Sequence, residues 1–372
     1  MNANITQTNS RTPAPGADPA APGAEASPVT AGSSPVTTGP ARSGGSQPDR
    51  PITVRPVPQP SPDASRRPRI THAGTRPLPP AAAADVVLAY LRIHAATLVS
   101  VEPMARADEP DAVHQMRVAA RRLRATLRSF GEVIPRSATA PLDAELRWLG
   151  ALLGQVRDGE VLPSQLHASL RPVPAELVIG PVHARVQGHF SPRHAAALAE
   201  LVAALDSGRF AALLAALDRL TLDPPRGPRA GDPAADVLPA AVRRAYRQAG
   251  RRMRGARHAP AGPSRDAALH SARKSARRAR YAAEAAAPAI GRPARRFSRQ
   301  MKKVQSVLGE HQDSVLARQA ARDLGIGAHL SGENAFSYGL LHELEHHKAE
   351  LLQVQARRVW RHASRSRYRR WM

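Results

Sequence analysis

The sequence predicts an all-α protein whose helices form two four-helix bundles related by an internal duplication with pseudo-twofold symmetry. Three observations lead to this prediction. From about residue 81 the chain is rich in Ala, Leu and Arg with helical periodicity. The alternation of Val, Ile, Thr and aromatic residues that is typical of strands is nearly absent. Finally, three short sequence patterns occur twice in the same order, with roughly four helices in each half.

The first 80 residues are predicted to be a disordered tail. They hold 17 of the 35 prolines and no Phe, Trp or Tyr. Such a segment cannot bury enough apolar surface to offset the conformational entropy that folding costs. Its eight arginines and four acids supply only four of the 24 net positive charges, so most of the charge belongs to the part that folds.

The first two pairs of helices carry two of the repeated patterns. Residues 82–102 and 234–256 contain the matched stretches ADVVLAYLR and ADVLPAAVR. Residues 110–133 and 264–287 each contain the pattern H-x-x-R-x-x-x-R-R-x-R, and GPSRD offers a start for the second of them.

The remaining helices complete each half. Residues 139–168 and 292–324 contain the matched LGQVRD and LGEHQD. The last pair is 191–220, for which SPRH offers a start, and 333–364. The Pro- and Gly-rich segment between the halves is a linker. The folded part is therefore divided into half-repeats 81–222 and 234–364, with linker 223–233 and a basic C-terminal end, 365–372.

The repeated pattern places a row of cations on one helix face. At 100° per residue, the first copy falls within an arc of roughly 80°, and consists of His114, Arg117, Arg121, Arg124 and Arg128. Only Arg122 lies clearly off this stripe. A separate apolar stripe predicts the core face: Met116, Ala120, Leu123, Leu127 and Phe130.

The second copy repeats this geometry, and the helix after it adds a third stripe. The second copy consists of His270, Arg273, Arg277 and Arg280, with Lys274 beside it and Glu284 at its end. The third stripe is Arg295, Arg299 and Lys302, with Lys303 alongside, opposite an apolar face of Phe297, Met301, Val304 and Leu308. The equivalent positions in the first half are less basic, and they are Ala140, Ala144, Arg147 and Trp148. The two halves are therefore expected to bind unequally.

The stripes have two interpretations. One is a solvated face held by salt bridges, but residues 112–131 and 267–283 contain no Asp or Glu, so acids would have to come from other helices. The candidates are Asp158, Asp313, Glu145 and Glu310, too few for both stripes. The favoured interpretation is anion binding, because arginine makes bidentate contacts to phosphate oxygens. A cation about every 5 Å suits a linear array of phosphates.

The net charge of +24 and the pI near 11.6 also predict a polyanionic partner. Aromatics do not interleave with the arginines as they do in single-strand binders, and Asn or Gln needed for duplex readout are missing among the cations. Non-specific nucleic-acid binding stays open as the alternative. Without cysteine, disulfides and thiolate chemistry are excluded. No signal peptide and no membrane span of ~18 apolar residues are expected, which favours the cytoplasm.

The stretches VHQMRVAARRLRATLRSF and LHSARKSARRARYAAE, with the later LGQVRD and VLGEHQD, resemble the CHAD domain, the conserved histidine α-helical domain. The resemblance covers roughly 81–364. It implies two pseudo-symmetric four-helix bundles, binding of inorganic polyphosphate, and in some members association with polyphosphate granules. Many relatives are fused to a triphosphate-hydrolysing CYTH domain, whose E-x-E-x-K signature is not found here, so no hydrolase activity is carried over.

The resemblance assigns ligand contacts by position. In the first half these are His114, Arg117, Arg121, Arg122 and Arg124; in the second they are His270, Arg273, Lys274, Arg277, Arg278, Arg280, Lys302 and Lys303. The stripes add Arg128, Arg295 and Arg299. The expected protein is non-enzymatic and needs no cofactor. No oligomeric state is predicted.

The histidines at the start of each stripe have two open roles. His114 and His270 could donate to phosphate or carry a pH-dependent charge. Alternatively, each could bond a carboxylate, for which Asp158 and Asp313 are the candidates.

Two further segments suggest other functions. HELEH, residues 342–346, matches the zinc-protease pattern H-E-x-x-H. No acid follows Glu350 as a third ligand, and Ala349 stands where the metzincin extension has Gly, so no metal or catalytic site is assigned. The basic C-terminal end could extend the polyanion surface or contact an anionic membrane, but fraying is favoured.

Overall fold

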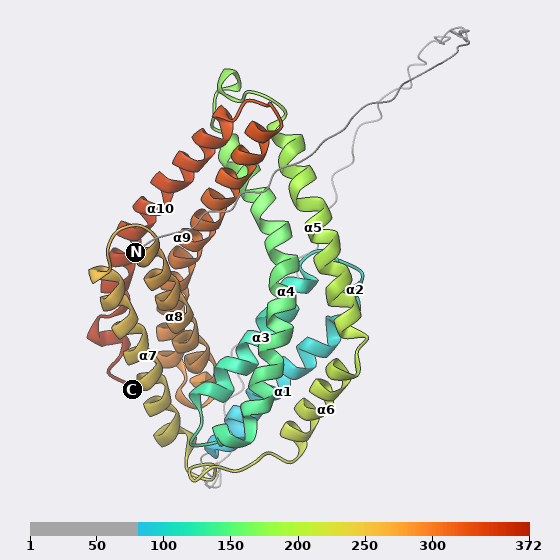
Figure 1. The fold of residues 1–372 in the computed structure, drawn as a ribbon. Helices are drawn as coiled ribbons and strands as arrows, with labels where there is room; N and C mark the ends of the chain where they lie inside the picture. Colours follow the sequence, from blue (N-terminus) through green and yellow to red (C-terminus); the bar gives the residue numbers. More distant parts are fainter. Residues whose placement is uncertain (1–80) are drawn as a thin grey trace, which may run out of the picture. The chain divides into compact units, whose positions relative to one another are not determined.

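The computed structural model describes residues 81–372, and Figure 1 shows that the elements of this part are helical. The predicted tail 1–80 lies outside the described residues. The first half contains α1 (Ala83–Ser100), α2 (Glu102–Arg106), α3 (Ala112–Ser129), α4 (Arg136–Leu170), the short 3-10 helix η1 (Ala175–Leu177), α5 (Val182–Leu205) and α6 (Gly208–Leu222). The second half contains α7 (Ala234–His258), α8 (Pro263–Ile290), α9 (Arg292–Leu330), α10 (Phe336–Ala363) and the 3-10 helix η2 (Ser366–Tyr368). The prediction of an all-α, duplicated fold is confirmed.

The helix boundaries differ from the prediction mainly in the first half. The single helix expected over 191–220 is two helices, because the Ser207 hydroxyl accepts a hydrogen bond from the Phe210 amide and caps α6. SPRH is not a helix start: α5 begins at Val182 and carries Pro192 inside, where the missing amide removes one helical hydrogen bond. α2 is a further short helix between α1 and α3. The second half keeps the expected four α-helices.

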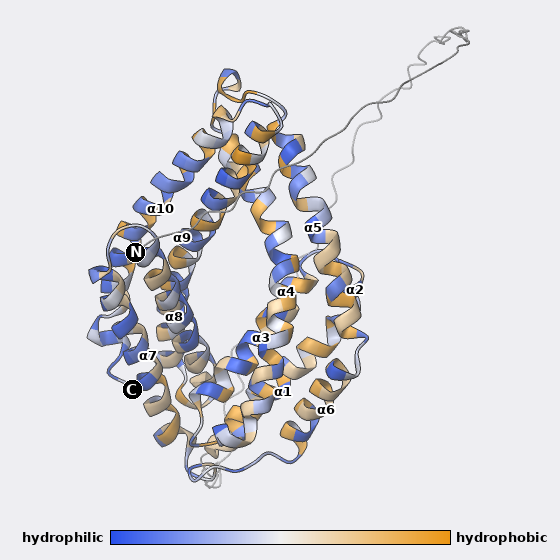
Figure 2. Ribbon diagram, in the orientation of Figure 1, coloured by the Kyte–Doolittle hydropathy of each residue, from blue (hydrophilic) through white to orange (hydrophobic). Residues whose placement is uncertain are grey.

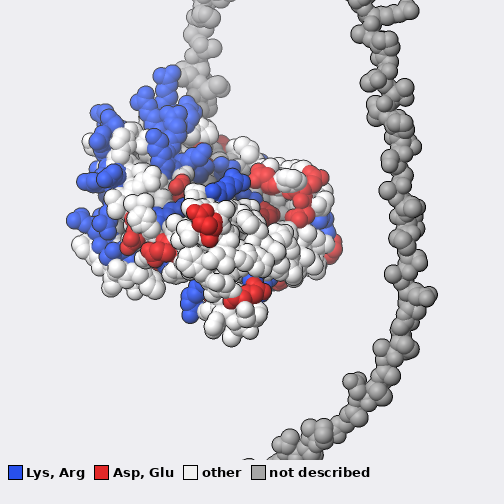
Figure 3. Space-filling model, turned by 90° about the horizontal axis from the view of Figure 1, so that it is seen from above, with Lys and Arg blue, Asp and Glu red and all other residues white. Residues whose placement is uncertain are grey.

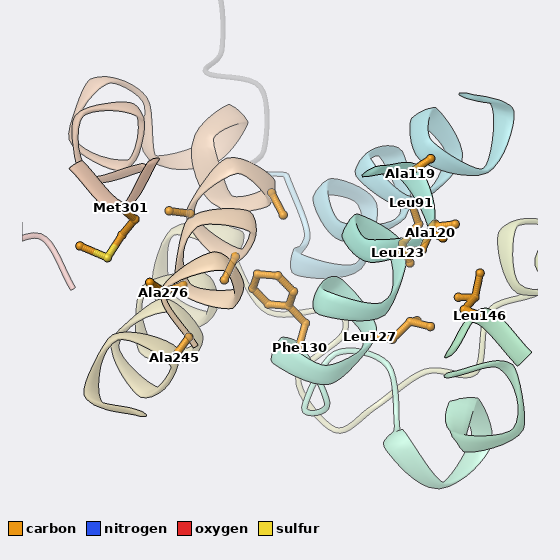
Figure 4. Close-up of a cluster of buried hydrophobic side chains, with 14 of the residues drawn as sticks. Leu91, Ala119, Ala120, Leu123, Leu127, Phe130, Leu146, Ala245, Ala276 and Met301 are labelled. Carbon is orange, nitrogen blue, oxygen red and sulfur yellow. The ribbon is translucent and has the colours of Figure 1, made fainter. Parts of the chain in front are cut away.

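The predicted apolar stripes form the core. Met116, Leu123 and Phe130 of the first stripe are at most 1% exposed, and Phe297 and Met301 of the second are fully buried. Figure 4 shows the Phe130 ring pointing from the end of α3 toward α8. The buried face of α8 consists mostly of alanines, so neighbouring helices can approach it closely. Figure 2 shows that each helix has apolar and hydrophilic stretches, and that the hydrophilic ones include parts of α3 and α8 that face the other half.

The two halves contact each other at two places. At one, α3 and α1 pack against α8 within the main core cluster. At the other, Leu166 and Leu170 of α4 share a second apolar cluster with Leu324 of α9 and Leu341 of α10. There the buried carboxylate of Glu345 accepts a hydrogen bond from Gln165 of α4 at 3.1 Å. Between these contacts the ribbons of α4 and α9 diverge (Figure 1).

Helix α1 is long and apolar enough in composition to cross a membrane, which differs from the expectation that no segment is. In the structure, Val87, Leu91 and Leu98 of α1 are fully buried in the main core cluster. The apolar character of α1 is therefore accounted for by packing against α3, α7 and α8.

The prediction that the C-terminal end frays is wrong, because its residues make defined contacts. The Trp371 indole donates to the Tyr368 carbonyl at 2.9 Å, and its ring lies 6.1 Å from that of Phe297. Arg369 donates to the Ser364 carbonyl at 2.8 Å. These contacts fold the last residues back onto α9 and the end of α10, because Trp and Tyr supply apolar area that the short segment can bury.

Candidate functional site

The two cationic stripes lie opposite each other where α3 of the first half packs against α8 of the second. Burial lowers the pKa of the Arg277 guanidinium, and the charge of Arg121 across the interface lowers it further. Burial likewise lowers the pKa of Arg121. Both groups stay protonated at neutral pH because an arginine starts from a pKa above ~12. Each half therefore places a half-buried cation against a cation of the other half.

A three-residue unit is repeated on each side of this contact. The Arg117 guanidinium of α3 lies over Gly154 of α4, where a Cβ atom would be 3.3 Å from its Nη2 atom. The Arg273 guanidinium of α8 lies over Gly309 of α9, with the equivalent approach at 3.5 Å. The glycines of the repeated LG stretches thus leave room for the arginines.

An aspartate completes each unit. Arg117 Nη1 lies 3.8 Å from Asp158 Oδ1, and the Asp158 side chain is 54% exposed. Burial raises the pKa of Asp158 and of Asp313, while the charge of Arg273 lowers both. We define the inner surface as these facing residues: Arg117, Arg121, Arg273 and Arg277, with Asp158 and Asp313.

One of the two roles left open for these histidines, a bond to one of the aspartates, is not found in the part of the chain that the structure describes. Within residues 81–372, neither His114 nor His270 forms an ion pair with a carboxylate; His270 instead hydrogen-bonds Gln312. Burial lowers the pKa of His114, helped by the charge of Arg157, and burial and Lys274 lower the pKa of His270. Both imidazoles are therefore mostly neutral at pH 7, because the ordinary histidine pKa is about 6.5.

Three predicted contact residues are held by acids. Glu284 accepts from Arg280 Nε at 2.7 Å and lies 3.4 Å from Arg122 Nη2. Arg124 Nε lies 3.2 Å from Asp143 Oδ1 on α4. Glu284 follows Arg280 by four residues, so the sequence contained a signal for this pair. Asp143 was not expected, because only packing of α3 against α4 brings it to Arg124.

The remaining predicted residues lie on α3, α8 and α9. Burial lowers the pKa of the half-buried Arg278 guanidinium, and the charges of the exposed Arg128 and of Arg136 lower it further. Lys274 is exposed beside His270. The predicted cations of α9 are all exposed, and only some of them lie toward the inner surface. They are Arg295, Arg299, Lys302 and Lys303.

Two of the α9 cations turn toward the C-terminal end. Arg299 shares a groove with Arg367 and Tyr368. Lys303 is close enough to His362 to lower its pKa, after burial and two arginines. Lys302 lies on the same helix face as Gly309 and Asp313 by helical phase, which places it beside the inner surface.

Several buried nitrogens of the stripes and of the neighbouring Arg122 have no hydrogen-bond partner in the described part of the chain. They are the Nε atoms of Arg121, Arg122 and Arg273 and the Nδ1 atom of His270. Buried donors are almost always satisfied in native proteins. These atoms are therefore suited to a ligand that brings acceptor oxygens.

HELEH makes contacts of a different kind. Arg318 Nη1 lies 2.8 Å from His346 Nδ1. This contact occupies the Nδ1 atom of His346. Residues 81–372 contain no group of three or more His, Asp or Glu side chains arranged to hold a metal ion.

Comparisons with known proteins cover most of the folded part. Residues 89–322 match the sequence model of the CHAD domain. Two uncharacterized proteins of Mycobacterium tuberculosis, from strains CDC 1551 and H37Rv, are 35% identical over 285 residues, which is 77% of this chain and 54% of theirs. The chain thus spans about half the length of these relatives.

Two solved structures share the fold. PptA from Streptomyces chartreusis superposes with a TM-score of 0.64 at 21% identity, over 76% of this chain and 100% of its own. The CHAD domain from the plant Ricinus communis superposes with a TM-score of 0.57 at 25% identity, over 75% of this chain and 92% of its own.

Proposed function

The chain belongs to the CHAD domain family, and from this premise we propose that it binds inorganic polyphosphate through the inner surface without catalysing a reaction. The observation that supports this most is the pair of facing stripes, in which Arg121 and Arg277 repel each other across the two halves. A polyphosphate chain between them would supply the missing negative charge and accept from the unpartnered Nε atoms of Arg121 and Arg273.

The burial of these cations favours a narrow ligand. The Arg117 side chain is only 27% exposed, so a ligand must reach between α3, α4, α8 and α9 to contact it. Polyphosphate consists of linked phosphates without bases or sugars, whereas the phosphates of a duplex lie on the outside of a much wider body. The inner surface therefore fits polyphosphate better than a duplex.

The test is a double variant on the inner surface, Arg121→Gln with Arg277→Gln. Two charge-assisted contacts contribute about 1.5–3 kcal/mol each, so affinity for long-chain polyphosphate should fall by about a hundredfold or more. The control is Arg193→Gln with Arg219→Gln, which removes the same charge from exposed positions of α5 and α6. Equal losses in the two variants, measured by calorimetry at physiological salt, would contradict the inner surface as the site.

Two further measurements address the remaining parts of the proposal. Because polyphosphate relieves repulsion in the folded protein, its addition should raise Tm in proportion to the logarithm of ligand concentration. Phosphate release from polyphosphate should stay at the background rate, since no catalytic set is proposed. A fluorescent fusion should coincide with polyphosphate granules in the cytoplasm, and a diffuse signal in cells with granules would contradict that localisation.

A further inference from the structure

A second cationic surface lies outside the inner surface, along the junction of α7 with the last part of α10. On α7 the exposed arginines recur at helical spacing, with Arg243, Arg247, Arg254 and Arg257 within an arc of roughly 80°. Arg357, Arg358 and Arg361 share one face of α10. Tyr246 of α7 stacks on Trp360 of α10, with ring centroids 5.6 Å apart and planes at 16°, so the two helices are in direct contact.

Three grooves follow this junction. One, of about 610 Å³, has Met253, Val354 and Trp360 among its walls and Arg254, Arg257, Arg357, Arg358 and Arg361 around them. A second, of about 460 Å³, shares Arg254 and Trp360 with the first and adds Arg247, Arg251 and Arg369. A third, of about 510 Å³, continues beside the C-terminal end and is lined by Arg296, Arg299, Arg367 and Arg370. We define the outer basic face as Arg247, Arg251, Arg254, Arg257, Arg358 and Arg361.

This face lacks acids. Residues 237–265, 292–309 and 351–372 contain no Asp or Glu. Within residues 81–372, Arg244 is the one arginine of α7 or the last part of α10 that forms an ion pair. Its partner is Glu132, at 2.8 Å. Figure 3 shows Lys and Arg gathered on one side of the molecule, with smaller groups of Asp and Glu on both sides of that view. Exposed guanidinium groups without internal partners attract a polyanion at long range.

The breadth of the face distinguishes its ligand from that of the inner surface. The α7 arginines from Arg243 to Arg257 extend over about 21 Å at 1.5 Å per residue. The α10 arginines form a second row beside them across the grooves. A duplex presents two rows of phosphates on either side of a groove about 12 Å wide, whereas polyphosphate presents one row. Two rows of arginines therefore suit a duplex.

Other polyanionic partners fit less well. Single strands are usually held by stacking bases on exposed aromatic rings, but Tyr246 is covered by Trp360 and by the Arg369 guanidinium, 5.4 Å from its centroid. An anionic membrane surface would need an apolar patch to insert, and on this face the large apolar side chains that are exposed are Leu351 and Val354.

We propose that the outer basic face binds duplex nucleic acid through its phosphates, without sequence preference, independently of the inner surface. On α7 the amide side chain beside the arginines is Gln248, which accepts a hydrogen bond from Arg251, so direct base readout by α7 is not expected. Both polyanions can then bind one molecule at once, one between the halves and one on the outside of the second half.

The test compares duplex binding by two four-residue variants of the full chain. The first is Arg247→Gln, Arg254→Gln, Arg358→Gln and Arg361→Gln on the outer basic face. The matched control is Arg171→Gln, Arg193→Gln, Arg219→Gln and Arg322→Gln, all exposed and away from that face. Circular dichroism verifies that both fold, and fluorescence anisotropy with a mixed-sequence duplex is measured across a salt series.

The outer variant should bind duplex at least about tenfold more weakly, and its salt slope should fall by about three to four, since each phosphate contact contributes about 0.9 to that slope. The control should change by less than about threefold. Polyphosphate affinity of the outer variant at the same salt should change no more than that of the control.

Three results would overturn the proposal. One is unchanged duplex affinity in the outer variant. Another is loss of duplex binding in Arg121→Gln with Arg277→Gln, which would place the duplex at the inner surface. The third is parallel loss of polyphosphate and duplex binding in the outer variant, which would make the face part of a polyphosphate track. Because the proposed function is tested on Arg121 and Arg277, its failure is separate from any of these outcomes.

Discussion

The two halves of the protein carry the same cationic pattern on α3 and α8 but surround it with different charges on the next helix. Asp143 at the start of α4 pairs with Arg124 and Arg147, whereas Ser298 occupies the equivalent place on α9. Glu145 pairs with Arg209, and its counterpart is Gln300. Arg147 is therefore paired with an acid in the first half, whereas its counterpart Lys302 forms no ion pair within residues 81–372. The counterpart of Arg124 is Arg280, which pairs with Glu284 instead.

The two halves share the glycines beneath the arginines but differ in the charges at the starts of α4 and α9. The glycines under Arg117 and Arg273 occur in both halves, where a Cβ atom would meet the guanidinium closely at Gly154 and in ordinary contact at Gly309. The charged positions near the starts of the two helices differ, with Asp143 and Glu145 on α4 and Ser298 and Gln300 on α9. The second half should therefore contribute more to the affinity for polyphosphate, and the following predictions test that asymmetry.

The largest expected effect is on stability and concerns Glu284, which occupies the place of Arg128 in the second half. Glu284→Gln removes the acid shared by Arg122 and Arg280, whose side chains are mostly buried. Leaving them unpaired should lower the free energy of unfolding by about 3 kcal/mol. Arg128→Gln, at an exposed position, should change it by less than about 0.5 kcal/mol. Urea unfolding measures both, and similar losses would show that the two positions are interchangeable.

The core and the duplication could be predicted from the sequence because both are local patterns. The spacing of Met116, Leu123 and Phe130 fixes which face of α3 is buried, wherever its neighbours lie. The break between α5 and α6 was missed although Ser207 provides a capping signal, because the Leu- and Ala-rich pattern continues through it.

The pairing of charges could not be predicted in the same way. Asp143 meets Arg124, and Arg122 meets Glu284, only once α3 has packed against α4 and α8. The arginine spacing of α7 is visible in the sequence, but the end of α10 beside it lies far along the chain. The stacking of Tyr246 on Trp360 brings their arginines together into one face.

The second prediction compares equivalent cations on α9 and α4. Lys302→Glu reverses an exposed charge on the face of α9 that carries Gly309, and should weaken polyphosphate binding by about tenfold. Arg147→Glu reverses the equivalent charge in the first half, where Arg147 is 67% exposed and already paired with Asp143 at 3.6 Å. Its effect should be no more than about threefold. Calorimetry that finds equal losses would remove the asymmetry between the halves.

The third prediction concerns pH. His114 and His270 have lowered pKa values in the free protein, so they are mostly neutral at pH 7. A bound polyanion favours the charged imidazole and raises each pKa. Polyphosphate affinity should therefore rise as pH falls from 7.5 to 6, by about threefold to tenfold for the two groups together.

The control for this prediction is a variant in which both histidines are replaced, His114→Gln with His270→Gln. It should bind polyphosphate with an affinity that changes much less over the same pH range. If its pH dependence equals that of the unchanged protein, other groups such as Asp158 and Asp313 carry the titration. Comparing the two single variants then shows whether Arg157, near His114, or Lys274, near His270, makes the larger difference.

The smallest expected effect comes from adding one methyl group under each arginine. Gly154→Ala places a Cβ atom 3.3 Å from Arg117 Nη2, which is tight, whereas Gly309→Ala places one 3.5 Å from Arg273, which is ordinary contact. Each change also favours its helix by up to about 1 kcal/mol, since glycine is a poor helix former. Because only the flexible end of Arg117 has to move, Gly154→Ala should leave the protein at least as stable while weakening polyphosphate binding by about twofold to threefold. Gly309→Ala should stabilise without that loss, and a larger loss in Gly309→Ala would mean that Arg273 is held more rigidly than Arg117.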